Sequence, residues 1–208
     1  MEDPLDLRYP FGGKWLVRNS PADRVPSHGT AKFGSAFAID FVPVGDDDRS
    51  APYSFASFFR PEPTSVFPGL GRPVVAPLDG VVVGAHASEP DHDSYRGLPS
   101  VGYALTQRRR LRGGWRAMAG NFVLIEGRSP DRTAFVALCH LQEDSVMVAP
   151  GQVVRAGEEV GRCGNSGNST EPHLHLQVVD ARDVARATAV PITFEGRLPR
   201  NGEVVDAP

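Results

Sequence analysis

Apolar residues along this chain gather in short runs, and residues that form turns separate the runs. Helical periodicity is scarce. Runs of this length bounded by Gly, Pro, Asp and Ser are typical of β-strands. The pattern predicts strands over residues 37–42, 74–76, 80–83, 121–125, 133–138 and 174–178. It predicts turns at 77–80, 129–131 and 149–151.

Short strands joined by many turns favour an all-β fold, which we expect to be an antiparallel β-sandwich or barrel-sandwich with at most one or two short helices. The best helix candidate covers residues 102–111 and ends before Gly113 and Gly114. Two stretches, 45–72 and 85–119, resemble long loops inserted into the β core. Loops of this length commonly carry function, so we expect both to wall a groove.

Composition supports one large β domain. The chain has 208 residues, 40% of them hydrophobic, and includes 22 Gly and 19 Pro. We therefore assign residues 1–208 to a single domain with a substantial core. The net charge of −3 gives no general attraction to nucleic acid. No apolar stretch approaches the roughly 18 residues of a membrane span. The oligomeric state stays open.

The N-terminal residues and the cysteines bear on location. Residues 1–6 carry acidic groups where a signal peptide needs basic ones, and no apolar segment follows. We expect a cytoplasmic protein, or an extracellular or cell-wall protein if a leader has been trimmed. The two cysteines, Cys139 and Cys163, are best interpreted as small buried hydrophobic residues, with a disulfide between them as the less favoured alternative.

Four polar residues interrupt apolar runs and are the candidates for chemistry. Asp40 lies within 38–42 and His140 within 136–141. His173 and His175 are two residues apart, so on a strand they share one face. Burying such groups is unfavourable unless each polar atom finds a partner. Catalytic zinc takes three protein ligands and leaves a fourth position for water, and His and carboxylate side chains supply that set.

The surrounding segments are Ser27-His28-Gly29, Ala38-Ile39-Asp40-Phe41, Cys139-His140-Leu141 and Pro172-His173-Leu174-His175. In this order they resemble the lysostaphin-like (LytM-type) zinc metallopeptidases, which cleave peptidoglycan peptides. The resemblance covers most of residues 27–180. It implies a duplicated hybrid motif, in which a twisted antiparallel β architecture holds the site in a groove.

The resemblance also implies roles for five residues. It implies one Zn²⁺ per chain, with metal ligands at His28, Asp40 and His175. The two catalytic histidines that do not bind metal are then His140 and His173. One departure affects His28, which precedes Asp40 by twelve residues where many family members have four. Residues 31–36 must loop out between them.

The implied activity is that of a zinc metalloendopeptidase acting on Gly- and Ala-rich peptides of peptidoglycan. Which of His140 and His173 acts as the base stays open. The main alternative is a non-catalytic relative that binds peptidoglycan or a partner. A cupin is a poor match, because its His-x-His comes early and a Glu ligand follows, whereas here Gln177 follows the pair.

Other polar and aromatic clusters have simpler interpretations. His86 and the segment 91–93, which contains His92, fit a solvated loop better than a second metal cluster. The arginine run fits a solvated helix face better than a grip for an anionic polymer. Its members are Arg108, Arg109, Arg110, Arg112 and Arg116. The aromatic residues at 55, 58, 59 and 67 either line a groove or form a satellite core.

Overall fold

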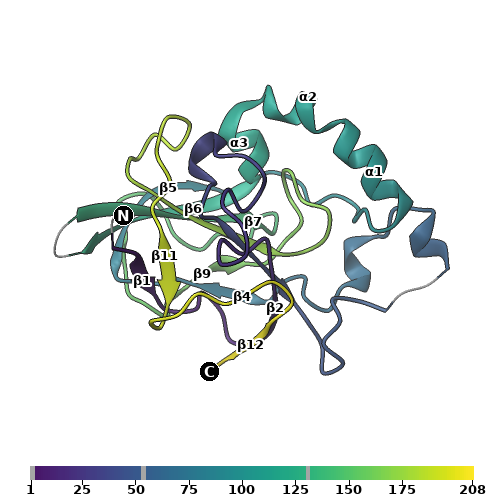
Figure 1. Cartoon of the computed structure of the whole chain (residues 1–208), viewed down its shortest axis with the longest axis horizontal. Helices are drawn as coiled ribbons and strands as arrows, with labels where there is room; N and C mark the ends of the chain where they lie inside the picture. Colours follow the sequence, from purple (N-terminus) through teal and green to yellow (C-terminus); the bar gives the residue numbers. More distant parts are fainter. Residues whose placement is uncertain (1–2, 53–54, 130–131) are drawn as a thin grey trace.

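One large antiparallel sheet organises the chain (Figure 1). The computed structural model describes residues 3–52, 55–129 and 132–208. The sheet has eight strands in the order β12-β2-β3-β10-β7-β6-β5-β8, and every neighbouring pair is antiparallel. In that order the strands are Val204–Ala207, Gly13–Arg18, Ile39–Pro43, Leu174–Val179, Arg132–Leu141, Asn121–Ser129, Gly80–His86 and Val153–Val154.

Two small sheets cover one face of the large sheet. Strands β1 (Leu5–Leu7) and β11 (Ile192–Phe194) pair in parallel, while β4 (Pro73–Val75) and β9 (Glu159–Arg162) are antiparallel. The main hydrophobic core lies between the large sheet and these two. It includes Trp15, Phe41, Val74, Leu138 and Phe194, all fully buried. The fold is therefore a mostly antiparallel β-sandwich, as the sequence predicts, because burial of both inner faces requires a second layer.

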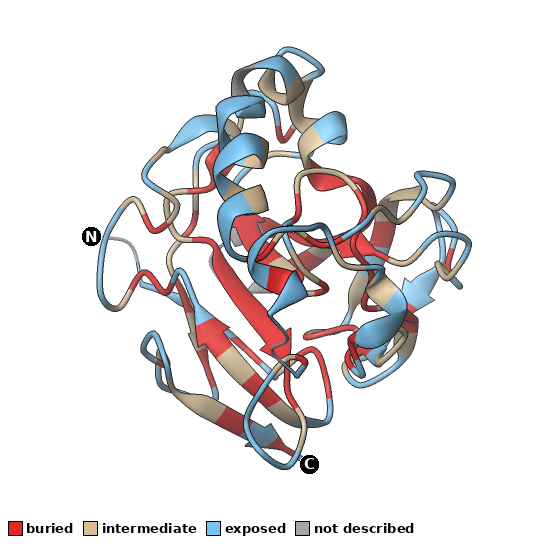
Figure 2. Cartoon of the chain, turned by 90° about the vertical axis from the view of Figure 1, so that its right-hand side faces the viewer, coloured by how far each residue is buried: buried red, intermediate tan, exposed pale blue. Residues whose placement is uncertain are grey.

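Helices lie over the opposite face, as Figures 1 and 2 show. They are α1 (Leu98–Leu105), α2 (Gln107–Leu111) and α3 (Gly114–Ala119). In α3, Trp115 and Ala119 pack on Phe122 and Cys139 of the sheet in a second hydrophobic cluster. The described residues also form 3-10 turns at Lys32–Gly34 (η1), Ala56–Phe58 (η2) and Thr64–Val66 (η3).

The helix prediction was partly wrong. The expected segment 102–111 lies within α1 and α2. However, α1 begins earlier, at Leu98, and Thr106 separates the two helices. Helix α2 ends at Leu111, just before Gly113 as expected, and α3 begins at Gly114, which has a φ of +77°. The described residues thus contain three α-helices where the sequence predicted one or two. A left-handed glycine ends one helix readily and lets the next begin in another direction.

Among the described residues the six predicted strands are all present, and six further strands were not predicted. Those not predicted are β1, β2, β8, β9, β11 and β12. The predicted turn at 129–131 falls largely on residues 130–131, which lie outside the described part of the chain. Cys139 and Cys163 are both free and buried, so the favoured interpretation is confirmed. No helix among the described residues is long and apolar enough to cross a membrane.

Candidate active site

The register of the central strands brings Asp40 and His175 together. His175 of β10 is paired directly with Asp40 of β3, so both side chains project from the same face of the sheet. The Nδ1 atom of His175 lies 2.8 Å from Oδ1 of Asp40. These strands lie at the centre of the large sheet, which fixes the relative position of the two side chains.

His28 reaches the same carboxylate from a loop. Residues between His28 and Asp40 form η1 and a turn that returns to Ala36, whose carbonyl accepts the amide of Ser27 at 3.0 Å. The loop places Nε2 of His28 3.0 Å from Oδ2 of Asp40. The predicted ligands His28, Asp40 and His175 therefore converge, with their nearest ligand atoms within 4.8 Å of one another. Among the described residues no other such group of three is found.

Strand β10 separates a hydrophobic side from a polar side. Leu174, Leu176 and Val178 point into the main core. His175 and Gln177 alternate with them and line a cavity, together with His173, which directly precedes the strand. Nε2 of His173 is 3.7 Å from Oδ1 of Asp40. The prediction that His173 and His175 share one side is therefore confirmed.

A β-bulge turns His140 toward the same cavity. In a regular strand His140 would share the side of Leu138 and point into the main core. The pairing of β6 and β7 slips at this position, and His140 has a φ of +62°. Leu141 then returns to the core, and the His140 ring lies 4.7 Å from that of His173. Bulges commonly redirect a side chain beside a functional site.

Hydrogen bonds fix which nitrogen of His175 carries the proton. The amide nitrogen of Gln177 donates to the carbonyl of Phe33 at 2.7 Å, so Oε1 of Gln177 faces His175. That oxygen can only accept, and it lies 3.0 Å from Nε2 of His175. Nε2 is therefore the N–H, and in the neutral ring the lone pair on Nδ1 points at Asp40.

Hydrogen-bond partners also fix the tautomers of His28, His140 and His173. Ser27 donates its hydroxyl to Ser35 and so accepts from Nδ1 of His28 at 2.9 Å. For the other two, backbone carbonyls accept from Nδ1. These bonds are His140 to Ser166 at 2.9 Å and His173 to Glu171 at 2.8 Å. When any of these three rings is neutral, its proton is on Nδ1, and the unprotonated Nε2 is available to a ligand in the cavity.

This donor set fits a divalent cation. Two ring lone pairs facing one carboxylate repel one another unless a proton or a metal ion lies between them. Burial raises the pKa of Asp40, but the neighbouring His28, His173 and His175 hold it well below its usual range. Asp40 is therefore an anion. Two imidazoles and a carboxylate form a three-ligand set typical of catalytic zinc, in which ligating histidines are held by partners of this kind.

His140 and Cys139 also line the cavity but differ chemically. Burial, with His173 and His175 nearby, holds the pKa of His140 well below its usual value, so the ring is neutral. Burial raises the pKa of the Cys139 thiol, so it remains protonated and is a poor ligand or nucleophile.

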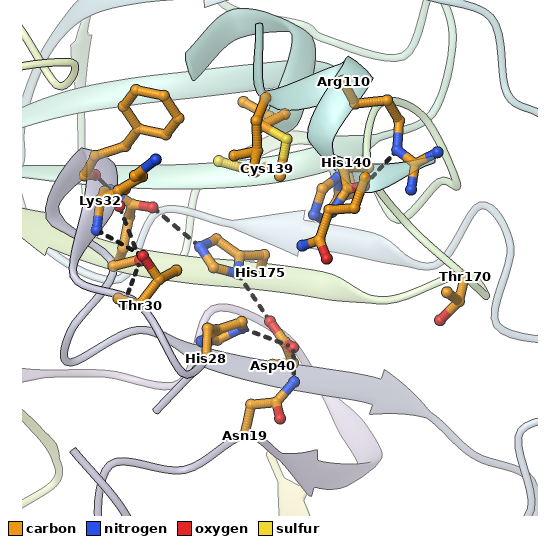
Figure 3. Close-up of a pocket in the computed structure, with 18 of the residues that line it drawn as sticks. Asn19, His28, Thr30, Lys32, Asp40, Arg110, Cys139, His140, Thr170 and His175 are labelled. Atoms are coloured by element: carbon orange, nitrogen blue, oxygen red, sulfur yellow. Dashed lines mark hydrogen bonds and ion pairs between the residues drawn. The ribbon is translucent and has the colours of Figure 1, made fainter. Parts of the chain in front are cut away.

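The cavity has a volume of about 580 Å³ and opens between the sheet and the helices (Figure 3). Residues of α1, α2 and α3 form one wall, as the sequence predicts for the second long loop. The described residues of 45–72 do not line it, so that part of the prediction was wrong. There Phe67 is buried, whereas Phe55 and Phe59 are exposed, and none of them reaches the cavity.

Two other expectations need correction. His92 lies in a loop, as expected, but its half-buried side chain is not free in solvent, because its ring nitrogens lie 2.8 Å and 3.0 Å from the carbonyls of Asp93 and Gly167. It joins this loop to the segment that contains Ser166 and Ser169, which contact His140 and His173. In the arginine run, Arg109, Arg112 and Arg116 are exposed as expected. Arg110 instead lines the cavity.

Two supporting residues were missed by the sequence analysis. Asn19, just after β2, donates to Oδ2 of Asp40 at 2.7 Å and leaves no sequence signal. Gln177 had one, since it lies two residues after His175 on the same face of the strand.

The chain is similar to known peptidases. The model of Peptidase family M23 matches residues 104–187, a segment that contains His140, His173 and His175. His28 and Asp40 precede it. The chain is 25% identical over 193 residues to the peptidoglycan DD-endopeptidase ShyA of Vibrio cholerae serotype O1, covering 93% of this chain and 31% of ShyA. It is 36% identical over 61 residues to the peptidoglycan DD-endopeptidase ShyB of the same organism, covering 29% of this chain and 13% of ShyB. The chain thus matches less than a third of either relative.

Solved structures give matches at lower identity. The catalytic domain of lysostaphin from Staphylococcus simulans has 19% identity and a TM-score of 0.41, with 89% of this chain and 88% of that domain covered. The catalytic domain of the M23 protein EnpA from Enterococcus faecalis has 17% identity and a TM-score of 0.43, with 92% and 91% covered.

Proposed function

We propose that this chain, whose residues 104–187 match the model of Peptidase family M23, is a zinc-dependent metalloendopeptidase of peptidoglycan. The observation that carries the proposal is the convergence of His28, Asp40 and His175. Their nearest ligand atoms lie within 4.8 Å of one another, and hydrogen bonds orient the lone pairs of both rings toward the carboxylate. We propose one zinc per chain, held by these three residues.

Bound zinc supplies a Lewis acid for the scissile carbonyl and lowers the pKa of water toward about 7. The chain supplies the proton transfers. His140 and His173 each hold Nδ1–H on a backbone carbonyl and present an unprotonated Nε2 to the cavity. Either can take the proton that the attacking water loses. While it is protonated, the ring donates to the oxyanion and stabilises it, and it then passes the proton to the leaving amine.

The shape of the cavity and the relatives support the choice of substrate. A cavity walled by helices on one side admits an extended, slender chain more readily than a folded protein. Both curated relatives are named as peptidoglycan DD-endopeptidases. We therefore propose peptidoglycan-type peptides rich in Gly and Ala, whose small side chains such a cavity can accommodate.

The test is a panel of purified peptidoglycan fragments, oligoglycine and casein, each incubated with zinc-loaded protein with and without chelator. We expect chelator-sensitive cleavage of the cell-wall peptides and little cleavage of casein. Cleavage of casein alone would contradict the substrate class. If zinc-loaded protein binds the fragments but cuts none of the panel, the chain is instead a binding relative that has kept the metal site.

A further inference from the structure

The cavity contains more positive than negative charge. Lys32 and Arg110 line it, and Asp40 is the one acidic side chain among its described lining residues. Figure 3 shows Lys32 and Arg110 on opposite sides of the histidine cluster. Asp40 is already engaged by three histidines and Asn19. Because the whole chain has a net charge of −3, this local excess of cations is a property of the cavity and not of the protein.

Arg110 is held in a fixed position. Its Nε donates to Oδ1 of Asn168 at 2.6 Å, and its Nη atoms donate to Thr106 and to the carbonyl of Tyr103, each at 2.7 Å. The guanidinium Cζ lies 3.6 Å from the centroid of the Tyr103 ring. A charged group held on four sides is preorganised for a ligand, because little further side-chain entropy is lost on binding.

The charge of Arg110 has no counter-ion among the described residues. All its partners are neutral, namely an amide oxygen, a hydroxyl, a carbonyl and an aromatic ring. A guanidinium has five N–H donors, and three are used here. The remaining two lie on the Nη atoms. Such a pair of donors matches the two oxygens of a carboxylate.

The anchor of Arg110 belongs to the loop that positions the catalytic histidines. Asn168, which accepts from Arg110, lies between Ser166 and Ser169 in sequence. The carbonyl of Ser166 holds Nδ1 of His140, and the hydroxyl of Ser169 lies 3.0 Å from Nδ1 of His173. A substrate group bound at Arg110 is therefore held in a fixed position relative to His140 and His173, the residues proposed to move protons.

We propose that Arg110 binds a free carboxylate of the peptide substrate, so that the site selects acidic peptides over their amidated counterparts. The inference deepens the proposed function and rests on it. Arg110 acts here as a specificity residue that touches the substrate outside the scissile bond. Lys32, exposed on the opposite wall, adds long-range attraction for the same anionic peptides.

The test compares one substrate with its own amides. The probe is a soluble cross-linked peptidoglycan peptide dimer, together with derivatives in which one carboxylate at a time is converted to the primary amide. For wild-type protein we expect one of these amides to lower kcat/KM by about 10- to 100-fold, the range of a charge-assisted hydrogen bond. Arg110→Gln should bring the carboxylate-to-amide ratio for that position close to one. Arg110→Lys keeps the positive charge but loses the planar pair of guanidinium donors, so it should retain part of the preference for the carboxylate.

Arg109→Gln is the matched control, since Arg109 is exposed on the same helix and does not line the cavity. It should keep the wild-type ratio. A purely structural role for Arg110 would lower cleavage of acid and amide by the same factor and leave the ratio unchanged, and that result would overturn the inference. Equal cleavage of every amide by wild-type protein would also overturn it.

Binding measurements separate this inference from the proposed function. If zinc-loaded protein cuts none of the probes, the proposed function fails, and calorimetry with the same peptides still tests Arg110. Tighter binding of the acid than of one amide, lost in Arg110→Gln, would support carboxylate recognition without hydrolysis. Equal affinities, or no binding, would overturn it.

Discussion

His175 lies directly opposite Asp40 on neighbouring antiparallel strands, and its Nδ1 faces the carboxylate at 2.8 Å. The other nitrogen of the ring is held by Gln177 at 3.0 Å, so the strand pair sets the distance and Gln177 sets the tautomer. Both features come from the central sheet. A cation bound at the proposed site would therefore meet ligands that are already held in position.

The contribution of Gln177 can be measured. Gln177→Ala frees the His175 ring to rotate and to change tautomer, so we expect zinc affinity to fall about 10- to 100-fold while the fold is kept. Competition with a chromogenic chelator gives the affinity. Gln107→Ala, an exposed position on the cavity wall, is the control and should bind zinc as wild type does. Unchanged affinity in Gln177→Ala would show that the tautomer is fixed by other means.

Substitutions of His140 and His173 should reduce hydrolysis without reducing zinc binding. We expect His140→Ala and His173→Ala to retain full zinc occupancy and to lose hydrolysis by about 10²- to 10⁴-fold, the usual contribution of an acid–base group. Metal content and kcat/KM on one substrate measure both effects. Cleavage near the wild-type rate in either variant would remove that residue from the mechanism.

Acidification should release the metal through the histidines. The pKa of Asp40 is held well below its usual range, so this carboxylate stays ionised as the pH falls. Histidine must be neutral to bind zinc, so protons compete with the metal as the pH falls. Zinc content after equilibrium dialysis across pH 3–8 measures it. Full retention of zinc at pH 3 would be inconsistent with histidine ligands.

The backbone of Gly167 packs closely against that of Gly120, and this contact supports the segment that positions His140. Gly167 has a φ of +71°, and a Cβ there would clash with the amide nitrogen of Gly120. We expect Gly167→Ala to lower the free energy of unfolding by about 2 kcal/mol or more and to reduce activity, because the adjacent Ser166 carbonyl positions His140. Denaturant unfolding measures the stability.

Gly151 provides the comparison for this effect. Its φ is +94°, but a Cβ there meets nothing within 4 Å. Gly151→Ala should therefore show only the backbone strain, about 1 kcal/mol. Equal losses in the two variants would mean that the contact between Gly167 and Gly120 does not matter.

Alternation along β10 was enough to predict from sequence that His173 and His175 share one face, whereas the roles of the five site residues were implied by the family resemblance. With Leu174, Leu176 and Val178 assigned to the core, the residues at 173, 175 and 177 had to face the other way. The same rule would place His140 in the core, and only the bulge reverses that. A bulge depends on how two strands pair, which the sequence of one strand does not reveal.

The positions of His28 and Arg110 were harder to predict from sequence, because each depends on contacts with residues outside its own segment. His28 reaches Asp40 through a loop whose path depends on η1 and on the contact between Ser27 and Ala36. Arg110 was expected in solvent because a run of arginines is usually a solvated helix face. It faces the cavity because Asn168, from a distant loop, accepts its hydrogen bond.

The location of the metal tests the account most directly. Anomalous diffraction at the zinc edge, on crystals of zinc-loaded protein, identifies the ion and its ligands in one experiment. We predict one zinc per chain, at about 2.0–2.2 Å from Nε2 of His28, a carboxylate oxygen of Asp40 and Nδ1 of His175. A zinc ion bound elsewhere, or bound without His28, would contradict the ligand set on which the proposed function rests.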